Sequence, residues 1–147
     1  MEELAIARPN HARASSYKNK GLLRLARCAH PYLIIDLHGS RSQDFTVAVG
    51  TAPAHRAGRA QPMIEYISAR LAGLLGCDVL VDPPGFRANN PSTVTAHCWS
   101  ALGIPTLQIE ISRAFRRPRH DPAAYAMLFT AFSTLIGELC SHPVAAQ

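Results

Sequence analysis

Two short stretches decide the fold: Tyr-Leu-Ile-Ile-Asp-Leu-His-Gly at residues 32–39 and Thr-Leu-Gln-Ile-Glu-Ile-Ser-Arg at residues 106–113. Side chains alternate between the two faces of a strand, so Asp36 and His38 share one face, and Glu110 lies opposite the isoleucines beside it. A carboxylate within such an apolar run is costly to bury unless it is paired, metal-bound or catalytic. The two stretches therefore predict that a His, an Asp and a Glu converge at one end of a sheet, as in a metal-assisted hydrolase.

The rest of the chain alternates between helical and strand-like segments. Apolar periodicity and helix start and stop signals predict four helices, at about 20–29, 62–75, 93–102 and 122–140. Four strands are predicted at about 32–38, 45–49, 78–81 and 105–112. This alternation predicts a single α/β domain over residues 1–147, a three-layer sandwich with a mixed sheet flanked by helices. In such folds ligands bind beyond the carboxyl ends of the strands, where both polar stretches end.

Proline, glycine and capping residues predict where several helices begin and end. Pro62 fits the first turn of its helix, Ser92 and Asp121 fit the caps of theirs, and Gly76 fits a helix stop. Residues 1–15 read as an irregular arm and residues 142–147 as a frayed tail. The last helix has a predicted buried stripe that is wide and apolar, made of Tyr125, Leu128, Phe129, Phe132, Leu135, Ile136 and Leu139.

Composition limits the function classes. The formal net charge is +5, and the basic residues are thirteen Arg and two Lys. Arginine suits bidentate recognition of carboxylate or phosphate, so an acidic substrate and a nucleic acid are both consistent with the charge. A genome that favours arginine codons explains the same bias. A nucleic-acid binder is the weakest of these interpretations, because aromatic residues are few and are not interleaved with the arginines.

The chain shows no secretory signal and no segment that we expect to span a membrane, so a cytoplasmic location is the default prediction. The four cysteines are widely spaced and include no Cys-x-x-Cys pair, which disfavours a structural zinc site. Their apolar surroundings predict reduced thiols in the core.

His38 is the candidate metal ligand. It follows a buried strand and precedes Gly39, where the backbone can turn sharply. A neutral imidazole here could bind zinc, and Asp36, two residues earlier on the same face, could orient the ring. A purely structural Asp-x-His pair is the alternative.

Glu110 is the candidate general base, because a carboxylate flanked by isoleucines should be poorly solvated. The alternative is a Glu paired with one of the arginines. Arg113, Arg116 and Arg87 are candidates to bind a substrate carboxylate. Arg117 and Arg119 are better explained as parts of a solvated basic loop.

The motifs Asp-Leu-His-Gly at 36–39, Val-Gly-Thr at 49–51 and Leu-Gln-Ile-Glu-Ile-Ser-Arg at 107–113 resemble the N-formylglutamate amidohydrolase family. That family is related in fold to the zinc carboxypeptidases. The resemblance, over residues 30–118, implies one zinc ion, a metal-activated water, and hydrolysis of an amide or N-acyl bond in a small acidic acyl-amino-acid or peptide substrate. A non-catalytic module of the same fold, binding an acidic ligand through its arginines, is the alternative function.

By this resemblance His38 matches a histidine ligand and Glu110 the catalytic glutamate, while Arg113 and Arg116 fall in an arginine-bearing segment. The family also implies a His and a Glu ligand from a loop near the N-terminus, but no His-x-x-Glu occurs in this chain. A segment upstream of residue 1 could supply these ligands, or His11 could do so together with Glu2 or Glu3. A degenerate member without metal is the third explanation. If the site is catalytic, His38 and Glu110 should lie roughly 4–8 Å apart, since metal–ligand bonds are near 2 Å.

Overall fold

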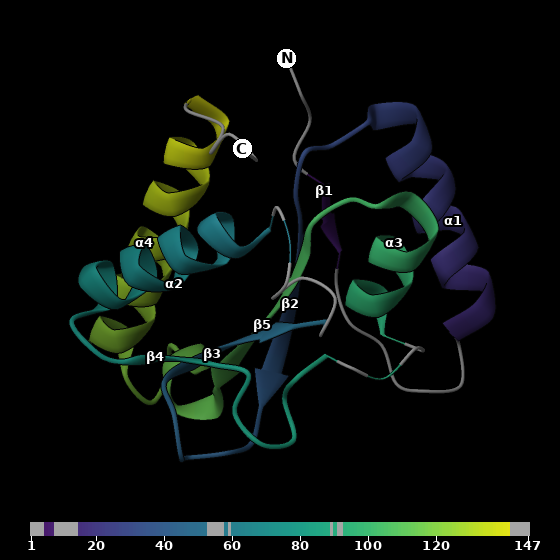
Figure 1. Ribbon diagram of the computed structural model, residues 1–147. Coiled ribbons are helices and arrows are strands. Elements are labelled where there is room, and N and C mark those ends of the chain that lie inside the picture. Colours follow the sequence, from purple (N-terminus) through teal and green to yellow (C-terminus); the bar gives the residue numbers. More distant parts are fainter. Residues whose placement is uncertain are drawn as a thin grey trace.

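The computed structural model describes residues 5–7, 15–52, 58, 60–88, 90 and 93–141. They form a mixed sheet of five strands with helices on both faces, which confirms the predicted three-layer α/β class (Figure 1). The strands are β1 (Ala5–Ala7), β2 (Ile34–Ser40), β3 (Val47–Thr51), β4 (Val79–Val81) and β5 (Thr106–Ser112). The helices are α1 (Ser15–Ala29), α2 (Gln61–Leu75), α3 (Val94–Leu102), the short 3-10 helix η2 (Arg113–Arg116) and α4 (Pro122–Ser141).

The strand order is β1-β2-β5-β3-β4. β1, β2 and β5 are parallel to one another, whereas β3 pairs antiparallel with β5 and parallel with β4. The carboxyl ends of β2 and β5 therefore lie side by side at one edge of the sheet, next to the start of β3. This topology brings the two polar stretches together, as the sequence predicts.

The two faces of the sheet have different cores. α2 and α4 cover one face, and α1 and α3 lie on the other (Figure 1). The α2–α4 side holds the larger core, which includes Leu33 just before β2, Ile35 from β2, and Leu107 and Ile109 from β5. The α1–α3 side buries a smaller cluster around Ile34. The alternation of side chains in β2 and β5 thus places most apolar contacts on the α2–α4 side.

Local signals set most helix ends as predicted. α2 has a proline in its first turn and ends at Gly76, which has a left-handed φ of 63°. Asp121 accepts a hydrogen bond from the Ala124 amide at 2.9 Å, as a cap of α4 should. For α3 the cap is Thr93 and not Ser92: the Thr93 Oγ1 accepts from the Ala96 amide at 3.1 Å. Ser92 itself lies outside the described residues.

The N-terminal prediction needs correction. Residues 5–7 are not part of an irregular arm but form β1, which pairs with β2 in parallel. Helix α1 begins at Ser15, earlier than the predicted start near residue 20. A three-residue strand next to charged residues and Pro9 has too short an alternation to be recognised from sequence. The predicted frayed tail at 142–147 lies outside the described residues.

The predicted stripe of α4 is partly wrong. Leu128, Phe132 and Leu135 are buried, but Tyr125 is 39% and Phe129 is 65% exposed. Phe129 follows Leu128, so it is turned by about 100° around the helix axis and leaves the core-facing side. By length and composition α4 is also long and apolar enough to cross a membrane, contrary to the sequence expectation. Core helices of soluble proteins meet the same criterion, and four α4 leucine and phenylalanine side chains lie in the main core.

The cysteine prediction is also only partly right. The described cysteines are all free thiols, but Cys28 and Cys140 are exposed and Cys77 is partly buried. Only Cys98, on α3, is fully buried. Burial and the charge of Asp36 raise the pKa of the Cys98 thiol to about 11. Cys98 therefore packs against the polar side of β2.

Candidate active site

Three pairs of polar residues form a ladder across β2 and β5. In the parallel register Asp36 pairs with Gln108, His38 with Glu110, and Ser40 with Ser112. All six positions are on the same face of the sheet because they are two residues apart along each strand. The ladder lies on the α1–α3 side, close to the carboxyl ends of the strands.

The His38 ring lies between two carboxylates. Its Nε2 is 2.9 Å from Asp36 Oδ2, and its Nδ1 is 3.7 Å from Glu110 Oε1. Asp36 is 1% exposed, and its second oxygen, Oδ1, is buried with no hydrogen-bond partner among the described residues. The predicted convergence of His38, Asp36 and Glu110 is confirmed, with the His38–Glu110 distance just below the expected 4–8 Å.

The charge balance at His38 favours its protonated form when no metal is bound. Partial burial lowers the pKa of the imidazole, but the hydrogen bond to Asp36 and the negative charges of Asp36 and Glu110 outweigh it. The net result is a pKa raised above the ordinary value for histidine. The site thus concentrates negative potential around one imidazole, which is also what a cation requires.

The geometry of the ring fits one position of a metal site. At 2.9 Å, a neutral imidazole can donate its Nε2 proton to Asp36, and the lone pair of Nδ1 then points toward the side of Glu110. This is the carboxylate–histidine arrangement that orients metal-binding histidines. Three protein ligands are usual for catalytic zinc, however, and among the described residues no group of three His, Cys, Asp or Glu side chains is arranged so that it could hold a metal ion. His11, Glu2 and Glu3, considered as further ligands, lie outside the described residues.

Gln108 holds the carboxylate of Glu110. Its Nε2 donates to Glu110 Oε1 at 2.8 Å, and both residues are only 7% exposed. The sequence analysis did not assign Gln108 to the site. The signal was available, since Gln108 is a polar residue two positions before Glu110 on the same strand face. Among the described residues Gln108 Oε1 is buried without a partner, so the amide is oriented by Glu110 alone.

The neighbouring strand β3 has small residues beside this pair. Ala48 is paired with Glu110 and Gly50 with Gln108, so neither position presents a large side chain. At Gly50 a Cβ atom would lie 2.3 Å from the Phe86 carbonyl oxygen, which means that the loop after β4 approaches the strand at this point. Only glycine permits this approach.

Asp82 fixes the loop after β4. Its carboxylate accepts from the Thr51 amide and the Thr51 hydroxyl, both at 2.6 Å, and it adopts a left-handed φ of 50°. The predicted substrate residue Arg87 lies on this loop and is exposed. Among the described residues no hydrogen bond or ion pair joins Arg87 to His38 or Glu110, so its role toward a substrate stays a prediction.

Arg116 has a structural task that the sequence did not indicate. Its Nε donates to the Ile111 carbonyl at 2.9 Å, and an Nη donates to the Ser40 carbonyl at 3.0 Å. The guanidinium lies directly against Gly39, where any Cβ would collide with it. Arg116 therefore ties the carboxyl ends of β2 and β5 together, and its substrate role also stays a prediction.

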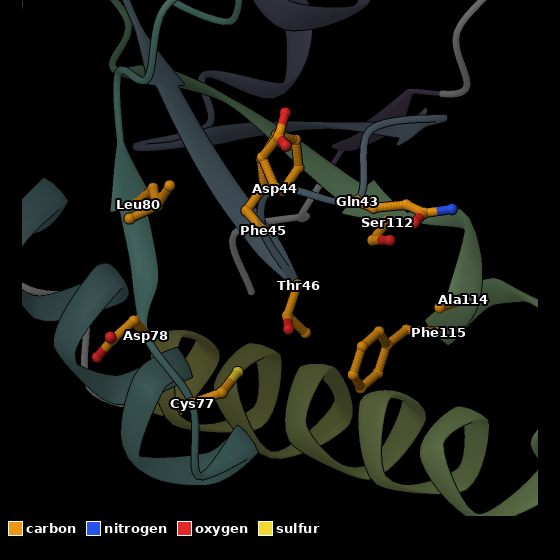
Figure 2. A pocket seen from close by; sticks show the side chains of 10 residues that line it. All are labelled: Gln43, Asp44, Phe45, Thr46, Cys77, Asp78, Leu80, Ser112, Ala114 and Phe115. Atoms are coloured by element: carbon orange, nitrogen blue, oxygen red, sulfur yellow. The ribbon is translucent and has the colours of Figure 1, made fainter.

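Two cavities adjoin this end of the sheet. Figure 2 shows one of about 490 Å³, where Phe115 and Thr46 lie on opposite sides of the space and Asp44 and Asp78 are also lining residues. The second, of about 390 Å³, is lined by Arg113 and other basic residues. Neither His38 nor Glu110 lines the two cavities, so both lie beside the ladder and not within it.

Comparisons with known proteins give a fold-level result. No protein-family profile matches the chain, and no curated protein matches it. A zinc-free form of YNDL has a similar structure, with a TM-score of 0.55 and 18% identity over 86% of this chain and 63% of that one. A bacteriophage poly-gamma-glutamate hydrolase aligns over 77% of this chain and 58% of that one, with a TM-score of 0.46 and 19% identity. The chain thus spans about three fifths of each, and the likeness to YNDL supports the three-layer α/β fold.

Proposed function

We propose that the chain is a zinc-dependent amidohydrolase that cleaves an amide or N-acyl bond in a small acidic substrate, such as an N-acylated glutamate. The observation that carries this proposal is the placement of the His38 imidazole between Asp36 and Glu110 at the carboxyl ends of two adjacent parallel strands. A structural Asp-x-His pair explains the Asp36 contact, but it gives no reason for a second buried carboxylate beside the other ring nitrogen. The motif resemblance points to the same chemistry.

In this proposal Asp36 accepts a hydrogen bond from the Nε2–H group of His38 and so fixes the orientation of the ring. Nδ1 is then available to hold zinc. Donors outside the described residues would complete the ligand set. A zinc ion bound there would polarise the acyl carbonyl and favour ionisation of water. Proton transfer and substrate binding would be carried out by side chains of this chain.

Glu110 acts as the general base and then the general acid. It takes a proton from the attacking water as the water oxygen bonds to the carbonyl carbon, and it gives a proton to the leaving nitrogen as the carbon–nitrogen bond breaks. Because Gln108 holds Oε1, the other carboxylate oxygen is the one free to exchange protons. The products are a carboxylic acid and an amine.

The acidic substrate class rests on the arginines near the ends of β2 and β5. Arg113 follows Glu110 by three residues and lines an open basic cavity. A carboxylate on the substrate can form a bidentate pair with such a guanidinium. A non-catalytic binding module that uses the same arginines is the second candidate, and the basic cavity is the observation that favours it.

A substrate panel separates the two candidates. Purified protein supplied with zinc is incubated with N-formylglutamate, N-acetylglutamate, and the matching N-acyl derivatives of glutamine and lysine, and the released amine is measured. We expect release from the acidic compounds only. Binding of acidic compounds without release of any amine would favour the binding module, and equal release from the lysine derivatives would contradict the proposed substrate class.

A further inference from the structure

The cavity of about 390 Å³ begins where β2 and β5 end, and basic side chains dominate its lining. Arg41 comes from the loop after β2, Arg113 from η2, and Arg117 and His120 from the segment before α4. Two stretches of the chain, the loop after β2 and residues 113–120, therefore contribute basic side chains to one space. Among the described residues that line it, none is Asp or Glu. The sequence analysis placed Arg117 in a solvated basic loop, but Arg117 is partly buried against this cavity.

Among the described residues, the arginines of this cavity have no ion-pair partner of opposite charge. Arg117 Nη1 is 3.4 Å from His120 Nε2, so these two basic groups are in contact. In the part of the chain that the structure describes, no ion pair joins Arg41, Arg113 or Arg117 to a carboxylate. Gathering guanidinium groups around one space costs electrostatic free energy that a bound anion would recover. The cavity is thus suited to an anion.

The adjoining cavity has the opposite character. It shares Gln43, Ser112 and Ala114 with the basic cavity, but its other lining residues include Asp44 and Asp78 (Figure 2). A carboxylate would be repelled from that side and attracted to the arginines. The carboxylate of an acidic ligand would therefore lie in the basic cavity and not in the adjoining one.

The distance from the ladder to the basic cavity is short. Ser112 lines the cavity and is two residues beyond Glu110 on the same strand face. Two residues of a strand extend over about 7 Å. A ligand whose amide lies at Glu110 would need about one more amino-acid unit, in an extended conformation, to reach Arg113.

We propose that the basic cavity is a separate carboxylate subsite, in which Arg113 and Arg117 bind an acidic group located one amino-acid unit away from the amide that reacts at Glu110. The assignment of the reacting amide rests on the proposed function, whereas the binding of the distal carboxylate rests on the cavity itself. A ligand that occupies both the site at Glu110 and this subsite is a short acidic peptide.

Calorimetric binding of two probes tests this subsite. N-acetylglutamylglutamate carries the distal side-chain carboxylate, and N-acetylglutamylglutamine replaces that group with a neutral amide. Titrations are made with the whole chain at low salt and with a chelator present, so that metal-dependent hydrolysis cannot consume the probes. The test variant is R113Q/R117Q. The matched control is R24Q/R27Q, which removes the same charge from exposed positions on α1.

We expect the unaltered protein to bind the acidic probe at least about tenfold more tightly than the amide probe, given the strength of charge-assisted hydrogen bonds. In R113Q/R117Q the preference should fall below about twofold, while R24Q/R27Q should keep it. Thermal unfolding of both variants verifies that they remain folded. An equal loss of preference in the two variants, no preference in the unaltered protein, or no binding at all would overturn the subsite.

The outcome is independent of the hydrolysis assay. If no amine is released from any substrate but the preference for the acidic probe depends on Arg113 and Arg117, the amidohydrolase proposal fails and the subsite stands. If hydrolysis is found but the preference is absent, only the subsite fails.

Discussion

The two faces of β2 and β5 differ in the chemistry of their side chains. On one face Leu33, Ile35, Leu107 and Ile109 are buried in the main core against α2 and α4. On the other face, one residue away along each strand, lies the polar ladder centred on His38. The comparison teaches that a single pair of strands supplies both the stability of the domain and its candidate chemistry. Substitutions on the two faces should therefore have separable effects.

The largest expected effect is on the polar face. Replacing Glu110 with Gln keeps the shape of the side chain but removes the group that exchanges protons. We expect the rate of amide hydrolysis to fall on the order of 10²–10⁴-fold, which is typical for loss of a general base. Steady-state kinetics with an N-acylated glutamate measure this effect.

The control for Glu110→Gln is Thr106→Val, on the same strand and face. Thr106 is fully buried, and its hydroxyl donates to the Ile104 carbonyl at 3.0 Å, away from Glu110. The valine variant should keep its hydrolysis rate within about threefold of the unaltered protein, a change of less than 1 kcal/mol. Equal losses in the two variants would mean that the strand as a whole, and not the carboxylate, determines activity.

Gln108 is expected to raise the rate of hydrolysis by orienting the Glu110 carboxylate. With Gln108 replaced by Leu, the Glu110 carboxylate loses the donor 2.8 Å from its Oε1. We expect a loss of about 10–100-fold in kcat, as is usual for partners that orient a catalytic or metal-binding group, with a smaller change in KM. A variant in which only KM rises would assign Gln108 to substrate binding.

On the core face the expected effect is on stability. Leu71 on α2 and Phe132 on α4 are both in the main core. Changing either to Ala should lower the free energy of unfolding by about 2–5 kcal/mol, because apolar contacts are lost and a cavity is left. Urea denaturation measures this loss. Weaker ligand binding at unchanged stability would show that the two faces are not separate.

The smallest expected effect is on thiol chemistry. Cys98 is buried beside Asp36, and burial together with the Asp36 charge raises the pKa of its thiol to about 11. At pH 8 nearly all of it is therefore protonated and unreactive. A colorimetric thiol reagent should react quickly with the exposed Cys28 and Cys140, and with Cys98 only after denaturant is added. Rapid reaction of Cys98 in the folded protein would mean that the polar face is open to solvent at α3.

Much of this arrangement could be predicted from the sequence, because alternation within β2 and β5 determines which side chains share a face. The convergence of His38 and Glu110 follows from that alternation once the strands are neighbours. The sequence does not predict that His38 is paired with Glu110 across the two strands. This register depends on how the helices pack against the sheet. The same holds for Arg116, whose contacts join Ser40 and Ile111 from different strands. Tyr125 and Phe129 were misplaced because helical periodicity does not tell how wide a buried stripe is.

The central claim is that the polar face of β2 and β5 holds a zinc-dependent amidohydrolase site with His38 as a ligand. The most direct measurement is hydrolysis of N-acylated glutamate during zinc titration, after treatment with a chelator, for the unaltered protein and the His38→Ala variant side by side. We predict that the unaltered protein regains its activity as zinc approaches one equivalent, and that His38→Ala does not. Equal recovery of the two proteins, or activity that the chelator does not change, would contradict the claim.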